Sequence, residues 1–363
     1  MAPDSFKGTA TAAAATRAIT DGWLSVRPGD ELIARPMADG GEGTLAAFAD
    51  AVAGSLRMPV RVTGPDGASV DAAWLLLPPT AEAPDGTAVV ELACTSGIEM
   101  LGDRRLPWDA HTRGFGEAIA AALAHGVSRL VLGIGSSAST DGGVGMLRAL
   151  GAEFRDASGD PVPDGARGLA AIRTAELAGL PPSPPGGVTV LSDVRNPLLG
   201  PDGAAAVFGP QKGFARADLA SADAGLAALA AVLPADPASP GAGAAGGTGF
   251  ALLAWGAPLV PGADAVAQLV GLGDAIADAD LVITGEGSFD GQSASGKVPS
   301  LVAAEAASAG VPVALVAGRI ATGVDTSAFR AAVSLTDLAG DPGAARADAV
   351  RWLREAGKAL AAG

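Results

Sequence analysis

The chain has 363 residues and a formal net charge of -15, from 24 Lys and Arg against 39 Asp and Glu. This length exceeds what one compact core usually organises, so we expect two or three domains. The acidic balance and the lack of any clustered basic run exclude a counterion-release binder of nucleic acid and disfavour an anionic membrane surface.

The residue types that are scarce exclude further chemistries. The sequence has no Tyr, one Cys (Cys94) and two His (His111 and His125), so Tyr phenol chemistry, an intramolecular disulfide and a Cys-built zinc site are excluded. We expect Cys94 to be a buried structural thiol and both histidines to sit at helix-capping positions. No charged-then-apolar leader and no long apolar stretch is visible, which indicates a cytoplasmic protein without a membrane partner.

Short apolar runs alternate with longer Ala-rich segments that carry spaced charges. In chain order these patterns predict a helix at 11–26, a helix at 42–52, strands at 60–63, 72–77 and 88–92, a helix at 112–125, a strand at 129–134, a helix at 145–150, a strand at 188–191, a helix at 218–232, a strand at 280–284, a helix at 300–309, a strand at 311–317 and a helix at 344–360. Pro- and Gly-rich stretches at 78–86, 181–187 and 234–247 are predicted loops. This alternation predicts an α/β fold with a buried, mostly parallel sheet.

Polar residues follow three of the predicted strands directly. Glycines, hydroxyls and carboxylates fill residues 135–143, 192–197 and 285–291, which come after strands 129–134, 188–191 and 280–284. Ligands of open α/β sheets bind outside the carboxyl ends of the strands. We therefore expect the functional residues in these three loops.

Three glycine-rich signatures are ambiguous. Residues 241–246 fit G-x-G-x-x-G but follow prolines rather than a strand, so an anion site at a helix start is favoured over a Rossmann cofactor site. Residues 291–297 resemble a Walker A loop, yet Val298 replaces the required Ser or Thr, and only a phosphate contact by Lys297 remains plausible. Residues 133–138 lie between a strand and a helix, which fits both a ligand-binding loop and a plain tight turn.

A set of carboxylates lies beside Gly, Ser or Pro rather than on charged helix faces. Its members are Asp4, Asp39, Glu42, Asp141, Asp193, Glu286 and Asp290. The same loops carry the cations Lys7, Arg195, Lys212 and Lys297. Each acid alone is explained as a helix cap or a turn residue. Together, they favour a metal-assisted reaction on an anionic substrate, because phosphoryl transfer needs acids for Mg²⁺ and cations near the transferred group.

Taken together, these loops and several further segments resemble the motifs of the type 1 glycerate kinase family, in particular its bacterial glycerate 2-kinase-like members. The segments that carry the resemblance are residues 2–9 (Ala-Pro-Asp-Ser-Phe-Lys-Gly-Thr), 36–44 (Pro-Met-Ala-Asp-Gly-Gly-Glu-Gly-Thr), 133–143, 193–198 with 207–213, 241–249 and 281–299. They occur in the family's order and span nearly the whole chain.

The resemblance implies an ATP-dependent kinase that phosphorylates D-glycerate with Mg²⁺ and gives 2-phosphoglycerate. It implies a flavodoxin- or Rossmann-like domain formed by residues 1–60 and 262–363, a second, mixed α/β domain inserted at 61–261, and an active site in the interdomain cleft. The partners would be D-glycerate and ATP, with the chain as a monomer or homodimer. A kinase of another small hydroxy or sugar acid, and a non-catalytic ligand-binding relative, remain as alternatives.

We assign roles within this hypothesis. Asp193 is the first choice for the base that deprotonates the acceptor hydroxyl, and Asp141 is its alternative. The candidate magnesium ligands are Asp39, Glu42, Glu286 and Asp290. The candidate contacts to phosphate or substrate are Ser5, Lys7, Ser136, Ser137, Arg195, Asn196, Lys212 and Lys297.

Two departures from the family pattern carry expectations. The family has an apolar strand before the motif at residues 2–9, whereas this sequence starts with Met1, so either its start is truncated or the first strand is very short. Ser288 occupies the place of the arginine in the family's Gly-Glu-Gly-Arg, which implies one binding cation fewer in that loop.

Overall fold

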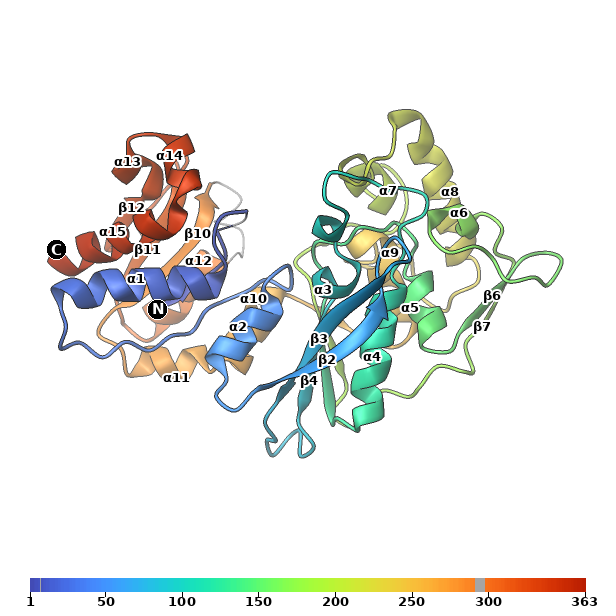
Figure 1. Ribbon diagram of the computed structural model, residues 1–363, viewed down its shortest axis with the longest axis horizontal. Helices are drawn as coiled ribbons and strands as arrows, with labels where there is room; N and C mark the ends of the chain where they lie inside the picture. Colours follow the sequence, from blue (N-terminus) through green and yellow to red (C-terminus); the bar gives the residue numbers. More distant parts are fainter. Residues whose placement is uncertain (7, 291–297) are drawn as a thin grey trace. The chain divides into compact units, whose positions relative to one another are not determined.

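The computed structural model of the protein describes residues 1–6, 8–290 and 298–363 (Figure 1). These residues form two compact units. Unit 1 comprises Met1–Asp39, Ala46–Ala53 and Ala263–Gly363, and unit 2 comprises Gly40–Leu45 and Gly54–Gly262. Both are built from β-sheets and α-helices, so the predicted α/β class is confirmed.

Unit 1 is organised around a sheet of four parallel strands in the order β1-β10-β11-β12. The strands are β1 (Ala2–Pro3), β10 (Val282–Phe289), β11 (Val313–Ile320) and β12 (Ala331–Ser334). The first strand has only two residues and pairs with β10, an inner strand of the sheet. All carboxyl ends therefore meet at one edge, where ligands of such sheets bind.

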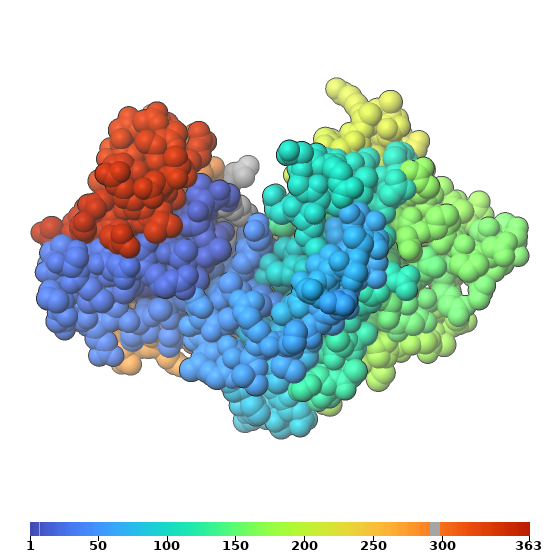
Figure 2. All heavy atoms as spheres, in the orientation of Figure 1, coloured from blue at the N-terminus to red at the C-terminus, as the bar shows by residue number. Residues whose placement is uncertain are grey.

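The helices of unit 1 include the first and last long helices of the chain, α1 and α15. In chain order they are α1 (Ala12–Val26), α2 (Thr44–Ala51), α10 (Gly262–Leu269), α11 (Leu272–Ala277), α12 (Val298–Ser308), α13 (Leu335–Ala339), α14 (Pro342–Ala347) and α15 (Ala349–Ala362); the first residues of α2 and α10 belong to unit 2. A Cβ on Gly22 of α1 would lie 2.0 Å from the Arg354 carbonyl oxygen of α15, so glycine permits the close approach of these helices. Figure 2 shows the two ends of the chain, blue and red, together on the surface of this unit.

Unit 2 has a six-stranded sheet in the order β2-β3-β4-β5-β8-β9 and a separate pair, β6-β7. The strands are β2 (Leu56–Thr63), β3 (Ser69–Leu77), β4 (Thr87–Glu91), β5 (Arg129–Gly133), β6 (Glu153–Arg155), β7 (Thr174–Glu176), β8 (Val188–Leu191) and β9 (Leu259–Val260). The pairs from β4 to β9 are parallel, but β2, β3 and β4 pair antiparallel. The pairing is thus mostly parallel, as predicted, and the antiparallel part arises where a short turn joins β2 to β3 and leaves β2 partly exposed.

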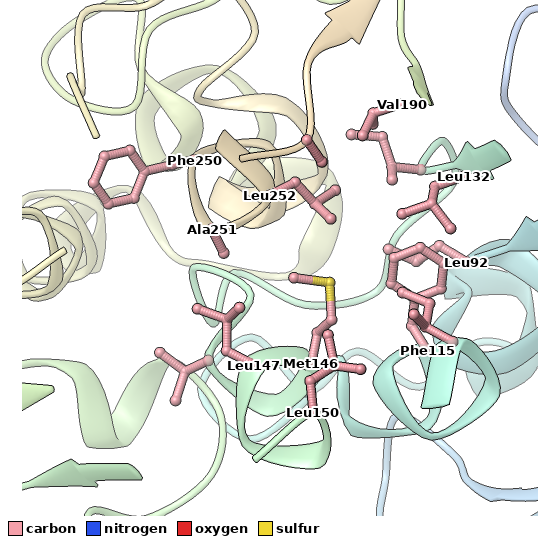
Figure 3. Close-up of a cluster of buried hydrophobic side chains, with 14 of the residues drawn as sticks. Leu92, Phe115, Leu132, Met146, Leu147, Leu150, Val190, Phe250, Ala251 and Leu252 are labelled. Atoms are coloured by element: carbon pink, nitrogen blue, oxygen red, sulfur yellow. The ribbon is translucent and has the colours of Figure 1, made fainter. Parts of the chain in front are cut away.

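The buried core of unit 2 lies between its sheet and its helices. The helices are α3 (Ala93–Ser96), α4 (Arg113–His125), α5 (Val144–Ala149), α6 (Ala166–Leu169), α7 (Ala204–Phe208), α8 (Leu219–Ala230) and α9 (Ala244–Ala254), with 3-10 turns at Ile98–Leu101, Pro210–Lys212 and Arg216–Asp218. Figure 3 shows Leu132 and Val190 of the sheet near Phe115 of α4, Met146 of α5 and Leu252 of α9. These contacts fix the carboxyl ends of β5 and β8.

Several elements of the structure differ from those predicted from the sequence. The predicted helix at 344–360 is two helices, since Asp348 accepts a hydrogen bond from Arg351 N and starts α15 after α14. The predicted loop at 234–247 contains the start of α9, where Ala245, Gly246 and Gly247 adopt left-handed backbone conformations. The sequence did not predict the strand pair β6-β7 or the short strands β9 and β12, because none of these strands has a long apolar run.

Three side-chain predictions have mixed outcomes. Cys94 is exposed, which corrects the expected buried thiol, because Thr95 and Ser96 take the buried side of α3. His111 Nδ1 accepts a hydrogen bond from Arg113 N at 3.4 Å, but the capping residues of α4 are Thr112 and Gly126, so each histidine lies one residue before a capping position rather than at it, as was predicted. Within the described ranges, no helix combines the length and apolar character needed to cross a membrane.

Candidate active site

Unit 1 contains a cavity of about 630 Å³ at the carboxyl ends of β1 and β10. Four of the residues assigned from the sequence line it: Ser5, Asp39, Glu286 and Asp290. Asp4 also lines it, so four carboxylates share one cavity. Hard oxygen donors of this kind suit Mg²⁺, which kinases hold through one or two carboxylates and phosphate oxygens.

The local structure brings these residues together. Asp4 and Ser5 follow β1, and the backbone from Arg35 to Met37 runs beside Met1 and Pro3 through two hydrogen bonds, which places Asp39 at the same edge. Glu286 lies in the second half of β10 and is 7% exposed, while Asp290 follows the strand directly. The strand order thus gathers residues nearly 300 positions apart in the sequence.

Two arginines that the sequence reasoning did not assign line the same cavity. Arg319 lies near the end of β11 and Arg346 lies in α14. Arg319 Nη2 donates to Ser288 Oγ at 3.3 Å, so a guanidinium reaches Ser288 from the neighbouring strand. The signal was available, because Arg319 follows the apolar run 311–317 just as the assigned residues follow other strands.

In unit 2, Asp141 is fully buried and accepts five hydrogen bonds. Its Oδ2 accepts from Thr112 N, Thr112 Oγ1 and Gly145 N, and its Oδ1 accepts from Ser139 Oγ and Gly143 N, at 2.8–3.2 Å. This carboxylate therefore joins the start of α4, the loop after β5 and the start of α5.

Lys212 is also buried in unit 2, at 3% exposure. Its Nζ donates to Ser137 Oγ at 2.8 Å and to the Ser139 carbonyl oxygen. Burial lowers the pKa of Lys212 from 10.5 to about 7, against the opposing effect of the Asp141 carboxylate. The assigned residues Ser137, Asp141 and Lys212 thus belong to one buried network.

The loop after β5 is strained and tightly packed. Ser136 is exposed and has φ 59°, a left-handed conformation that a residue other than glycine seldom adopts. Gly135 N donates to the Gly40 carbonyl oxygen at 3.0 Å, and a Cβ on Gly135 would lie 2.5 Å from Gly41 Cα. The segment that carries Glu42 therefore packs directly on the segment that carries Ser136.

The loop after β8 carries Asp193 and Arg195, both exposed. Asp193 Oδ1 accepts from Gly262 N at 2.8 Å, which orients this carboxylate at the end of the strand. The Asn196 side chain donates to the Asp202 carbonyl oxygen at 2.8 Å and so braces its own loop.

Sequence reasoning also missed a buried acid at the end of β4. Glu91 is 2% exposed, and its carboxylate accepts from Gly43 N at 3.1 Å and Leu45 N at 2.7 Å, on either side of the start of α2. Burial raises the pKa of Glu91, while these two hydrogen bonds lower it. A charged residue at the end of the apolar run 88–92 was the available signal.

Two assigned cations, Lys7 and Lys297, lie outside the described residues. Of the assigned magnesium ligands, Glu42 belongs to unit 2 and is exposed, whereas the other three belong to unit 1. Among the residues that the structure describes, no three His, Cys, Asp or Glu side chains form a ready metal-binding group.

Comparison with known proteins shows the family to which the sequence belongs. The family model described as "Glycerate kinase family" matches residues 1–362. A glycerate kinase of Bacillus subtilis is 43% identical over 329 residues, 88% of this chain and 84% of the relative. A glycerate 2-kinase of Escherichia coli is 41% identical over 329 residues, with the same coverage of 88% and 84%.

A solved structure is similar over the whole chain as well. The crystal structure of a protein named as a candidate glycerate kinase 2 from Salmonella typhimurium LT2 has a TM-score of 0.82 and 37% identity, covering 99% of this chain and 96% of that one. The class of protein is thus an α/β kinase. The chain belongs to the glycerate kinase family.

Proposed function

We propose that this protein is an ATP-dependent kinase that transfers the γ-phosphoryl group of MgATP to a hydroxyl of D-glycerate and gives 2-phosphoglycerate. The observation that carries the proposal is the match of the family model to residues 1–362, joined to a cavity that four carboxylates and two arginines line. The Escherichia coli relative named as a glycerate 2-kinase supports the position of the new phosphate ester.

The described carboxylates of the unit 1 cavity do not form a complete metal-binding group by themselves, so we propose that they bind a magnesium ion together with the nucleotide phosphates. Asp39, Glu286 and Asp290 would hold it, and the bound ion would neutralise charge on the nucleotide phosphates. Ser5 supplies a hydroxyl to an anionic oxygen, and Arg319 and Arg346 supply positive charge at the same cavity.

In unit 2, we propose that Asp193 accepts the proton of the acceptor hydroxyl. Support comes from its exposure after β8 and from the Gly262 N hydrogen bond that orients its carboxylate. Arg195 in the same loop, Ser136 and Glu42 remain proposed contacts to substrate or metal water.

The hydrogen bonds of Asp141 favour a structural role over that of the base that deprotonates the acceptor hydroxyl. Its oxygens already accept five hydrogen bonds in a buried network, so we propose that it holds the loop after β5 in place for Ser136 and Ser137. Lys212 reinforces the same loop through Ser137 and Ser139.

The test is an ADP-release assay with MgATP and D-glycerate, followed by NMR identification of the phosphorylated product. Glycerate-dependent ADP release with 2-phosphoglycerate as product is expected. Tartronate, erythronate and hydroxypyruvate serve as alternative acceptors, and a faster reaction with one of them would assign the activity to another hydroxy acid. Thermal stabilisation by D-glycerate without ADP release would indicate a non-catalytic binding relative.

A further inference from the structure

The unit 1 cavity is dominated by negative charge, which raises the question of what binds an anionic substrate there. The cationic side chains among its described lining residues are Arg319 and Arg346. An Arg guanidinium presents a planar fork of donors that matches the paired oxygens of a carboxylate or a phosphate. One of these arginines is fixed by the sheet.

Arg319 and Ser288 are register partners in the parallel strands β11 and β10. Side chains alternate between the faces of a sheet, and partners in a parallel pair share one face. The hydrogen bond from Arg319 Nη2 to Ser288 Oγ at 3.3 Å shows that the guanidinium reaches across to the neighbouring strand. A guanidinium based on residue 288 would project from this same face, one strand away.

The backbone beside Arg319 packs closely against the neighbouring strand β10. A Cβ on Gly318 would lie 2.4 Å from the Gly287 carbonyl oxygen, so the two strands approach as only glycine allows. Ladder pairs continue beyond this point, at Phe289 with Ile320. A binding group on a rigid strand loses little freedom when its ligand arrives.

Arg319 forms no ion pair within the described part of the chain. The side chain is exposed. Its described hydrogen bond goes to a neutral hydroxyl. A guanidinium that lines a carboxylate-rich cavity is thus able to bind an anion.

We propose that Arg319 is the anion-binding residue of the unit 1 cavity, with Ser288 as the hydroxyl that orients its guanidinium. The ligand group is a pair of anionic oxygens on a substrate of the reaction, either the glycerate carboxylate or a phosphate of ATP. This assignment rests on the proposed kinase function. It predicts that the guanidinium works equally well from either register partner.

The experiment compares the wild type with three full-length variants. Arg319→Gln removes the charge, and the double variant Ser288→Arg with Arg319→Ser moves the guanidinium to the neighbouring strand. Arg330→Gln is the control, because Arg330 is an exposed arginine that precedes β12 and does not line this cavity. Initial rates are measured against D-glycerate and against MgATP, and binding of each ligand alone is measured by calorimetry.

For Arg319→Gln we expect the KM and Kd of one substrate to rise roughly 10- to 100-fold, with the other substrate and the thermal midpoint unchanged. The affected substrate identifies the anion. The double variant should recover the lost affinity to within a few-fold, and Arg330→Gln should match the wild type. Unchanged constants in Arg319→Gln, or no recovery in a folded double variant, would overturn the proposal.

Failure of the kinase function can be told apart. A wild type that releases no ADP but binds D-glycerate or ATP refutes the proposed activity, and calorimetry on Arg319→Gln still decides the role of Arg319. A wild type that binds neither ligand overturns both proposals.

Discussion

The replacement Asp141→Asn should unfold unit 2 at a markedly lower temperature. The amide can keep an oxygen at the Oδ2 position, where Thr112 N, Thr112 Oγ1 and Gly145 N donate. Its NH₂ group must then face Ser139 Oγ and Gly143 N. The Ser139 hydroxyl can turn and accept, but Gly143 N is left facing another donor, and the remaining bonds lose their charge assistance.

One unsatisfied buried N–H costs about 1–3 kcal/mol, and the weakened charged bonds bring the expected loss to about 2–4 kcal/mol. For a unit of this size that corresponds to a fall of roughly 5–15 °C in the thermal midpoint. Differential scanning calorimetry measures it. Asp109→Asn is the matched control, because Asp109 is 56% exposed and pairs with Arg167 at the surface, where such pairs contribute at most about 1 kcal/mol.

The outcome also separates the two roles considered for Asp141. A variant with the wild-type midpoint and a rate reduced by orders of magnitude would refute the positioning role and support Asp141 as the base. A lower midpoint with a rate near the wild-type value below that midpoint would leave the base role to Asp193.

Three further predictions concern rate, pH and packing. Asp193→Asn should fold normally and lower kcat by roughly 10²–10⁴, measured by ADP release, and a wild-type rate would remove Asp193 as the base. Because the folded pKa of Lys212 is about 7, below its usual 10.5, the unfolded chain binds more protons between these pH values, so Lys212 makes the unfolding free energy rise with pH there. Lys212→Met should flatten that rise in urea titrations at pH 7 and 9, and an identical rise in the variant would contradict the buried-charge account. Gly22→Ala should destabilise unit 1 by about 1–3 kcal/mol, since the new methyl group would meet the Arg354 carbonyl oxygen, and an unchanged urea midpoint would argue against that packing.

The sequence predicted the long elements of this fold well and the short ones poorly. Helix 11–26 and strand 188–191 agree with α1 and β8 to within a residue, because a marked periodic or apolar run defines each. The antiparallel pairing of β2 with β3 depends on a short turn and on partial exposure, which a local apolar run does not encode. The break before α15 comes from a single capping contact of Asp348.

The candidate site shows the same division. Asp39 and Glu286 were found because each is a carboxylate beside glycine outside any predicted helix or strand, although Glu286 lies within β10, which extends five residues beyond the predicted strand 280–284. Arg346 was missed because it lies on a helix whose approach to the cavity is set only by tertiary packing. Asp193 and Asp141 have similar sequence contexts, but Asp193 is exposed and Asp141 is buried. The sequence alone could not assign their different roles, because no local pattern predicts this difference in burial.

The discontinuity of unit 1 has a consequence for biosynthesis. Thr284 Oγ1 donates to the Ala2 carbonyl oxygen across 282 positions, and α1 packs against a helix that ends at Ala362. During translation from the amino end, unit 2 emerges whole while Met1–Asp39 still lacks its partner strands. Until residues 263–363 have been synthesised, the buried face of α1 therefore lacks the strands and the helix that cover it in the folded protein, so we expect the core of unit 1 to form after that of unit 2.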